Sequence, residues 1–252
     1  QLLPRQGGVH VIRMIDVFKS FGEQKVLQGL NFEVEEGSSL VIMGPSGSGK
    51  SVVLKHLIGL LTPDSGRVEV LGQPVNPADG PALNALRRDM GYLFQHSALI
   101  NWLSVFDNVA LPLRETTSMS EAALKERVME VLGLVQMQDA PHKLPSEISG
   151  GMQKRVGLAR ALVTEPRIIL YDEPEAGLDP EMSAAISAMM RRLKEELGMT
   201  SVTVTHSVNC AVTVADTLAI FEHGKFLLAG PPADVLNSDH PRVQGFLGAA
   251  ID

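Results

Sequence analysis

The stretch GPSGSGKS, from Gly44 to Ser51, constrains the fold of this chain more than any other part of its sequence. It follows directly on the apolar run Leu40-Val41-Ile42-Met43, which predicts a buried strand, and the residues from Lys50 to Gly59 predict a helix. The stretch matches the pattern G-x-x-x-x-G-K-[ST], in which backbone N–H groups and the N-terminus of the next helix surround a polyphosphate. Strand, loop and helix in this order favour a phosphate-binding loop over an ordinary glycine-rich turn.

Each residue of this loop has an expected role. Lys50 would reach the β- and γ-phosphates of a nucleotide and so take part in catalysis, and Ser51 would ligate Mg²⁺. The glycines allow the backbone to approach the phosphates without a Cβ clash. The residues expected to bind the nucleotide phosphates in this loop are Gly44, Pro45, Ser46, Gly47, Ser48, Gly49, Lys50 and Ser51.

The rest of the sequence indicates an α/β fold in which strands alternate with helices, and this pattern implies a mainly parallel sheet. Residues 9–34 alternate apolar and polar side chains and predict antiparallel strands, whereas residues 95–150 are helical in character. The later expected elements are a helix at 153–164, a strand at 167–171, a helix at 180–197 ended by Gly198, a strand at 200–205 and a strand pair within 217–229.

Composition narrows the class of protein. The chain has 252 residues and a formal net charge of −7, and this acidic balance disfavours broad nucleic-acid binding. Its apolar runs are too short for a membrane helix, so we expect an ordinary globular protein. The one cysteine, Cys210, cannot form an internal disulfide and is expected to be a buried core residue.

Two further motifs add chemistry to the phosphate loop. Asp172 and Glu173 follow the apolar run Ile168–Tyr171; Asp172 would hold Mg²⁺ and Glu173 would act as the general base that activates water. A solvated strand end is the alternative for this pair when it is taken alone. Ser149-Gly150-Gly151 opens the predicted helix 153–164 and is either a second anion site or a simple serine cap.

Together these motifs resemble the ATP-binding subunit of an ABC transporter. They occur in the family's order along nearly the whole chain: GPSGSGKS as Walker A, Gln95 as Q-loop, ISGGMQKR as signature, IILYDEP as Walker B, AGLDP as D-loop and His206 in TVTHS as switch histidine. The resemblance implies a P-loop ATPase fold with a RecA-like core, an antiparallel β subdomain and an inserted helical subdomain. It implies one ABC ATPase domain over residues 9–252, with the helical lobe at about 96–155 and residues 1–8 as a tail.

The resemblance also implies a head-to-tail dimer that binds two ATP molecules with Mg²⁺. Ser149, Gly150 and Gly151 would contact the γ-phosphate held by the partner copy. Gln95 would contact Mg²⁺ and the attacking water, and His206 would contact the γ-phosphate. Asp179 would shape the dimer interface, and Phe21 would stack on adenine, although a core phenylalanine is nearly as plausible there. Two positions depart from the family pattern: Met152 replaces the usual Gln of the signature, and Glu175 adds a negative charge near Glu173.

Four segments are similar to the Mla phospholipid-transport ATPases of the MlaF type: Gln95–Leu99, Val105–Glu115, Ser149–Met152 and the ending Pro241–Leu247. This resemblance implies permease partners, an MCE lipid-binding protein and a place on the cytoplasmic face of the inner membrane. The alternative is the ATPase of a small-molecule importer of the amino-acid type, which a long C-terminal regulatory domain would favour. An apolar segment after Gln95 could line a groove for a permease or belong to the core of the helical lobe; its residues are Leu99, Ile100, Trp102, Leu103 and Phe106. We expect Trp102 and its neighbours to remain partly exposed, whereas for Phe106 the core is the preferred position.

Overall fold

The computed structural model describes residues 8–251, so the predicted tail 1–8 lies, except for Gly8, outside the described residues. The chain divides into two compact units, one containing the residues up to Arg87 and those from Thr200 onward, the other residues 88–199. The predicted helical lobe at 96–155 falls inside the second unit, which extends well beyond it. The single-domain boundaries 9–252 stay a prediction.

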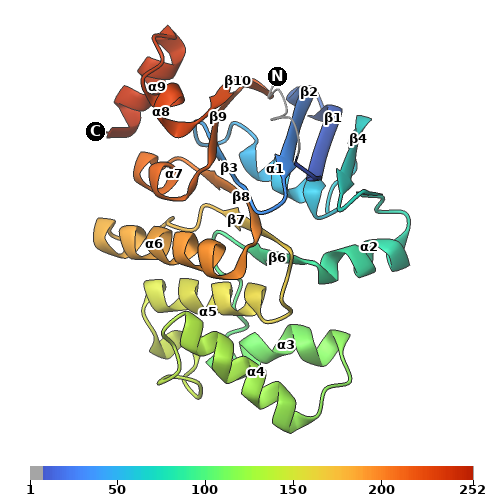
Figure 1. Cartoon of the computed structure of the whole chain (residues 1–252), viewed down its shortest axis with the longest axis vertical. Coiled ribbons are helices and arrows are strands. Elements are labelled where there is room, and N and C mark those ends of the chain that lie inside the picture. Colours follow the sequence, from blue (N-terminus) through green and yellow to red (C-terminus); the bar gives the residue numbers. More distant parts are fainter. Residues whose placement is uncertain (1–7, 252) are drawn as a thin grey trace. The chain divides into compact units, whose positions relative to one another are not determined.

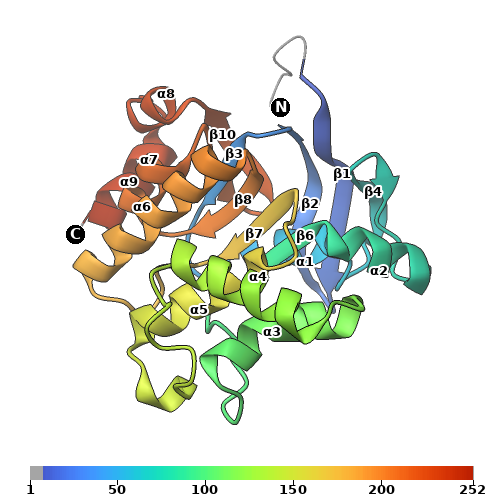
Figure 2. The ribbon, with the colours of Figure 1, turned by 60° about the horizontal axis from the view of Figure 1, so that its bottom comes forward.

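The first unit contains an antiparallel sheet, as residues 9–34 predict. Its strands are β1 (His10–Phe21), β2 (Gln24–Glu35), β4 (Ser65–Val70) and β5 (Gln73–Pro74). They follow the order β2-β1-β4-β5, and Figure 2 shows β2, β1 and β4 side by side. Strand β1 pairs with both β2 and β4. Alternate side chains of β1, such as Ile12 and Met14, are buried, as expected for a sheet with one face on the core.

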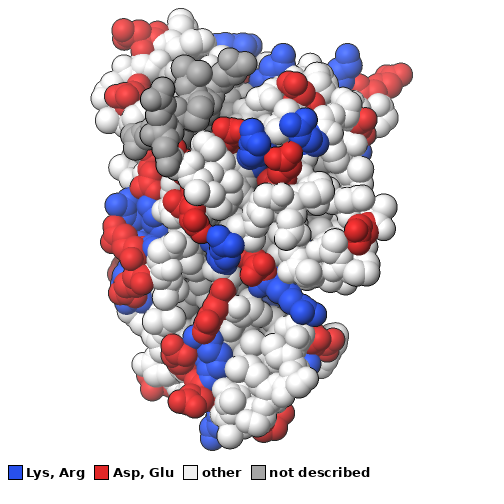
Figure 3. Space-filling view, turned by 45° about the vertical axis from the view of Figure 1, so that its right-hand side comes forward, with Lys and Arg blue, Asp and Glu red and all other residues white. Residues whose placement is uncertain are grey.

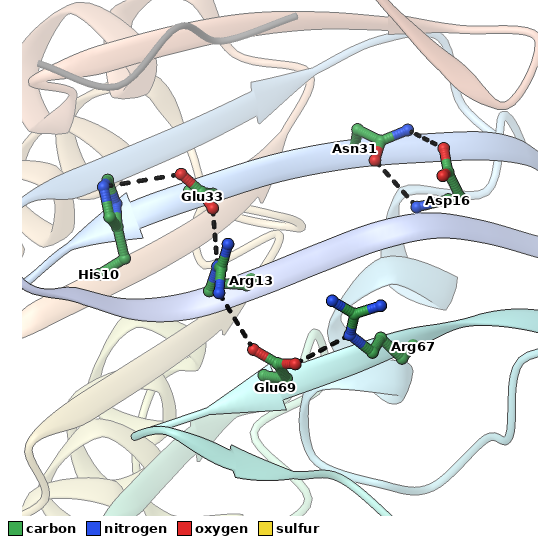
Figure 4. Close-up of polar contacts among 7 residues, drawn as sticks. All are labelled: His10, Arg13, Asp16, Asn31, Glu33, Arg67 and Glu69. Atoms are coloured by element: carbon green, nitrogen blue, oxygen red, sulfur yellow. Dashed lines mark hydrogen bonds and ion pairs between the residues drawn. The ribbon is translucent and has the colours of Figure 1, made fainter.

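A ladder of alternating charges crosses the three main strands of this sheet (Figure 4). Arg13 lies directly opposite both Glu33 and Glu69 in the strand register. Its guanidinium donates to Glu33 at 2.7 Å and to Glu69 at 3.4 Å, and Arg67 donates to Glu69 at 2.9 Å. His10 adds an Nε2–Oε2 contact of 3.6 Å to Glu33. Each such half-exposed pair contributes about 1 kcal/mol, so the ladder helps to set strand order and register more than stability.

The remaining strands of the first unit form a mainly parallel arrangement. They are β3 (Ser39–Met43), β8 (Thr200–Thr205), β9 (Thr217–Glu222) and β10 (Lys225–Gly230). The order is β10-β9-β3-β8, with β3 parallel to β8 and β9 and with β10 antiparallel to β9. Every residue of β3 and β8 is buried, as is typical of strands covered on both faces.

Short helices accompany these strands (Figure 1). They are α1 (Lys50–Leu57), α2 (Gly80–Arg88), α7 (Val208–Val214), α8 (Pro232–Leu236) and α9 (Pro241–Ile251). Helix α1 contacts β4 and β8, and α7 contacts β3. Cys210 of α7 is buried, as expected.

The second unit combines two parallel strands with helices. The strands are β6 (Met90–Leu93) and β7 (Ile168–Asp172). The helices are α3 (Val105–Thr116), α4 (Glu121–Leu134), the short 3₁₀ helix η1 (Pro145–Glu147), α5 (Gly150–Leu162) and α6 (Pro180–Leu197). Helix α5 contacts α3, α4, α6 and β6, so it is the central helix of this unit (Figure 1).

These observations confirm the predicted fold class: mainly parallel strands alternating with helices, an antiparallel sheet, and a helical segment. Among residues 8–251 no helix has both the length and the apolar character needed to cross a membrane. On the face in Figure 3, Lys and Arg side chains are interspersed with Asp and Glu, and the charges drawn there form no field of one sign.

Candidate nucleotide-binding and catalytic site

The predicted phosphate-binding loop joins β3 to α1, and its glycines stand where other residues would not fit. Gly49 is the N-cap of α1 with φ 105°, and a Cβ there would lie 2.4 Å from Val26 Cγ1. A Cβ on Gly44 would lie 2.3 Å from the carbonyl oxygen of Phe221. The loop backbone is therefore held close to its surroundings, as a cradle built from main-chain N–H groups requires.

Polar groups inside this loop fit a phosphate ligand. The Lys50 side chain is 4% exposed, and its Nζ donates to the carbonyl oxygens of Gly44 and Pro45, both at 2.8 Å. The Ser48 hydroxyl is buried and has no hydrogen-bond partner among the described residues. Leaving such a group unsatisfied costs about 1–3 kcal/mol, which a phosphate oxygen in the loop would relieve.

The structure brings His206 to the same cavity as part of the loop. This cavity of about 750 Å³ lies in the first unit and is lined by Pro45, Ser46, His206, Ser207, Glu222, Arg242, Gly245 and Phe246. His206 follows β8 and is exposed, and Ser207 next to it caps α7 by accepting from the backbone N–H of Cys210. The cap holds the turn that presents His206 to the cavity.

Phe21 is the last residue of β1 and is 47% exposed. The alternative interpretation from sequence, that Phe21 is a core residue, is therefore wrong. The Lys19 ammonium lies 5.5 Å from its ring centroid and donates to Asp64 Oδ1 at 2.8 Å and to the Thr62 carbonyl at 2.9 Å. Asp64 Oδ2 accepts from the backbone N–H of Ser20. The hydrogen bond from Lys19, followed by the one from Ser20, lowers the pKa of Asp64. The backbone just before Phe21 is thus anchored while the ring stays open to a stacking partner.

In the second unit, Asp172 and Glu173 lie at the end of the buried strand β7. Asp172 is 7% exposed and accepts a hydrogen bond from Tyr92 Oη at 3.1 Å. Burial and the charge of Asp172 raise the pKa of Tyr92 above its ordinary value, so the phenol remains a donor. Tyr92 was not predicted as a site residue; its place three residues before Gln95 was the available signal.

Glu173 is held by Gln95. The Gln95 amide donates through Nε2 to Glu173 Oε2 at 2.9 Å, so two predicted site residues 78 positions apart in sequence meet. Glu173 adopts φ 46°, a left-handed conformation that costs a residue other than glycine about 1–3 kcal/mol and is typical of functional sites.

Lys154, which was not predicted as a site residue, contacts both Gln95 and Glu173. It belongs to α5, is 4% exposed, and donates through Nζ to the carbonyl oxygens of Gln95 and Glu173. Burial lowers the pKa of Lys154, while the charges of Glu175, Glu173 and Asp172 act in the opposite direction. Glu175, which departs from the family pattern, is 5% exposed and supplies the largest of these opposing effects.

The signature residues open α5. Ser149 is its N-cap and accepts from the backbone N–H of Met152 at 3.3 Å. Ser149 and Gly150 are exposed, whereas Gly151 is buried against Met182 of α6. Asp179 is an exposed N-cap as well, accepting from the backbone N–H of Met182 at 2.9 Å. The serine cap that the sequence left as an alternative is therefore real, and it presents Ser149 and Gly150 at the surface of this unit.

Oxygen donors suitable for Mg²⁺ are present in the hydroxyl of Ser51, the carboxylate of Asp172 and the amide of Gln95. Within residues 8–251 no cluster of three His, Cys, Asp or Glu side chains could hold a metal on its own. Mg²⁺ commonly takes only one or two protein ligands and completes its shell with phosphate and water. Asp172 and Gln95 of the second unit and, separately, Ser51 of the first unit are donors of the kind that a nucleotide-bound ion takes.

The apolar segment after Gln95 remains partly exposed, as expected. Trp102 is 82% exposed, and Leu99, Ile100 and Leu103 have intermediate exposure. Phe106, for which a core position was preferred, also has intermediate exposure and is not fully buried. Asn108 holds the segment by donating to the carbonyls of Ile100, Leu103 and Ser104 while accepting from the backbone N–H of Ile100.

Comparisons with known proteins identify the family of this chain. The sequence matches the ABC transporter family over residues 27–176. Solved structures share the fold. One is cbiO1 of Clostridium perfringens, part of the ABC transporter complex cbiONQ, with a TM-score of 0.82 and 26% identity over 95% of this chain and 99% of that one. Another is the dimeric ATP-binding cassette MJ0796 bound to ADP and Pi, with a TM-score of 0.80 and 34% identity over 88% of this chain and 98% of that one.

Curated relatives are similar over most of this sequence. The probable ribonucleotide transport ATP-binding protein mkl of Mycobacterium leprae is 42% identical over 229 residues, which are 91% of this chain and 66% of that protein. The sulfate/thiosulfate import ATP-binding protein CysA of Bradyrhizobium diazoefficiens is 39% identical over 245 residues, 96% of this chain and 70% of that protein. The chain thus spans slightly less than two thirds of the mycobacterial relative. Neither name concerns phospholipids, so the Mla resemblance stays a prediction.

Proposed function

Because this chain belongs to the ABC transporter family and is an ABC-type ATPase cassette, we propose that it hydrolyses ATP to energise a membrane transporter. The observation that carries the proposal is the 2.9 Å hydrogen bond between Gln95 and Glu173 beside the buried Asp172. It unites the residues that hydrolysis needs in addition to a phosphate-binding loop.

The chain's own residues supply the proposed chemistry. Glu173 would accept a proton from the attacking water as the water oxygen bonds to the γ-phosphorus and the bond to the bridging oxygen of ADP breaks. Gln95 orients the Glu173 carboxylate, and Lys50 and Ser48 would donate to phosphate oxygens. Asp172, Ser51 and Gln95 would hold Mg²⁺, which when bound neutralises charge on the phosphates.

We propose the remaining site residues on the same basis. Phe21 would stack on adenine through its exposed ring, and His206 would reach the γ-phosphate from the cavity wall. Ser149, Gly150 and Gly151, with Asp179 at the interface, would complete the ATP site of a second copy of this chain. The dimeric cassette MJ0796 and the cbiONQ complex support such a dimer with membrane subunits as partners.

For the cargo we propose phospholipid, with an integral membrane permease pair and an MCE lipid-binding protein as partners and a peripheral position on the cytoplasmic face of the inner membrane. The support is the similarity of Val105–Glu115 and Pro241–Leu247 to the Mla ATPases. The exposed Trp102 segment after Gln95 supports docking to a permease, since a large exposed apolar side chain is a typical anchor.

A second candidate is the import of a small solute. The names of the CysA and mkl relatives, sulfate or thiosulfate import and ribonucleotide transport, favour it over the amino-acid type of importer considered from sequence. The ATPase chemistry proposed above is the same for either cargo.

The first test concerns hydrolysis. We expect Glu173→Gln to lower kcat for ATP at least about 100-fold while ATP binding is retained, because the substitution removes only the general base. Glu126→Gln, which changes an exposed glutamate of α4, is the matched control and should turn over at the wild-type rate. A Glu173→Gln variant with wild-type kcat would refute the assignment of the base.

The second test concerns the cargo. The chain would be purified from native membranes with its partners, and proteins and lipids would be identified by mass spectrometry. A permease pair with an MCE protein and phospholipid would support lipid transport. A periplasmic solute-binding protein without phospholipid would replace that proposal with solute import.

A further inference from the structure

Lys154 is the one buried lysine of the second unit's described residues that the proposed mechanism does not use. It lies on α5, five residues after the signature serine Ser149. Burying an ammonium group is costly unless it is paired and hydrogen-bonded, so a lysine that is 4% exposed has a specific environment. Here that environment is the Gln95–Glu173 pair.

The contacts form a closed ring of three residues. Gln95 donates from its side chain to the Glu173 side chain, and Lys154 donates to the main-chain carbonyls of both. One ammonium group thereby ties together the backbones on either side of the Gln95–Glu173 hydrogen bond. Because Glu173 adopts φ 46°, its backbone needs such support to stay in place.

Helix α5 touches the Q-loop at two more points on the same face, spaced three residues apart. A Cβ on Gly157 would lie 3.1 Å from Ser97 Cβ, so helix and loop are in close approach there. Arg160 donates to the carbonyls of Ser97 and Ala98 at 2.6 and 2.7 Å, two residues with positive φ. Helix α5 therefore holds the whole segment 95–98, but of these residues Lys154 alone also contacts Glu173.

We propose that Lys154 is a positioning residue that sets the geometry of Gln95 and Glu173 and transmits movement of the signature helix to them. The residue does not touch substrate; it acts through the two residues that do. The inference rests on the proposed ATPase function. It predicts that a shift of Ser149–Gly151 on binding a second copy's nucleotide changes the Gln95–Glu173 contact, because one rigid helix carries both ends.

The test is a double-mutant cycle on steady-state ATP hydrolysis by the full chain. Lys154→Met shortens the unbranched side chain by one atom and removes its three donors. We expect kcat to fall about 10- to 100-fold, as for a misplacement of about 1 Å, while the Kd for ATP stays within about twofold. Lys154→Arg, which keeps the charge but not the shape, should lose kcat as well.

The cycle separates positioning from loss of folded protein. In a Gln95→Ala background only the Glu173 backbone is left for Lys154 to position, so Lys154→Met should lower kcat by a clearly smaller factor than it does in the wild-type background. Arg160→Met is the matched control, since it removes a contact of α5 with the same loop without touching Glu173, and it should lower kcat by less than Lys154→Met does. Lys125→Met, on the exposed side of α4, should leave kcat unchanged.

The outcomes are distinct. A Lys154→Met loss that multiplies fully with Gln95→Ala, or that appears in Kd rather than kcat, would overturn the inference, and so would a wild-type kcat in Lys154→Met. If Lys154→Met is poorly folded, the Lys154→Arg and Gln95→Ala cycle gives the same decision. A wild-type chain without ATPase activity would instead refute the proposed function.

Discussion

At the scale of single residues, the candidate catalytic groups depend on neighbours that orient them. Glu173 is held by Gln95 and by Lys154, and Asp172 is held by Tyr92. Such neighbours of a metal ligand or a base fix its rotamer and often matter nearly as much as the group itself. The Tyr92–Asp172 contact is the simplest to test, because a single hydroxyl carries it.

We expect Tyr92→Phe to raise the Mg²⁺ concentration needed for half-maximal ATPase activity by about 10-fold, since losing a hydrogen-bond partner of a ligand typically costs 10- to 100-fold in metal affinity. The kcat at saturating Mg²⁺ should change little. A magnesium titration of initial rates measures the effect. Tyr171→Phe, which removes the other tyrosine hydroxyl of the chain, is the control; an equal shift in both variants would contradict a specific role for Tyr92.

The residue contacts also show what the sequence could not reveal. Gln95, Asp172 and Glu173 could be proposed from sequence because their types and order match a family pattern. Tyr92 and Lys154 were not, since a hydrogen bond between residues 80 positions apart, or a lysine that turns inward from a helix, depends on packing rather than on local pattern.

At the scale of elements, the helix after the phosphate-binding loop carries a buried titratable group. His56 of α1 is fully buried, and its Nδ1 is 2.7 Å from the carbonyl oxygen of Val52 one turn earlier. Burial lowers the pKa of His56 below its ordinary value of 6.5, because the imidazolium would lose its hydration. The folded chain therefore binds this proton less readily than the unfolded chain.

The sign of the resulting pH dependence follows from linkage. Above pH 6.5 both states are neutral at His56 and the full stability is present; as the pH falls below this value the unfolded state takes up the proton first, so the free energy of unfolding decreases. Urea unfolding at pH 7.5 and 5.5 measures the slope. His56→Leu should reduce the loss between these pH values, whereas His142→Gln, at an exposed position, should not. An unchanged slope in His56→Leu would contradict the prediction.

Elements with clear boundaries were predicted well. Helix α6 and strand β8 run over the predicted residues, because Asp179 caps the helix, Pro180 starts it and Gly198 ends it with φ 64°. Helix α5 begins three residues earlier than predicted, since Ser149 is its cap. Helix α3 was not predicted as a separate element. It contains Pro112, and proline usually interrupts a helix. Its packing against α5 is known only from the structure.

At the scale of the whole molecule, the proposed dimer makes each ATP site depend on two copies of the chain. One copy would provide Lys50 and its loop, and the other would provide Ser149–Gly151. The exposure of Ser149 and Gly150 supports this arrangement, because the signature N-terminus lies open at the surface of its unit. Variants that damage only one half of the site should therefore complement each other.

Lys50→Ala removes the lysine that we propose binds phosphate but leaves the signature intact. Gly150→Asp does the reverse by adding a carboxylate where the partner's γ-phosphate would bind. A Cβ at Gly150 lies no closer than 3.7 Å to Leu178, so the fold accommodates a side chain there. Each variant alone should be inactive. In an equal mixture half of the dimers are mixed and each has one intact site, so about one quarter of the wild-type rate should return if the two sites act independently. Steady-state ATP hydrolysis of the mixture measures this recovery. If the wild type is active and both variants are folded, no recovery would mean either that a dimer needs two intact sites or that two copies do not form a shared site. Cross-linking the mixed dimer would separate these two explanations.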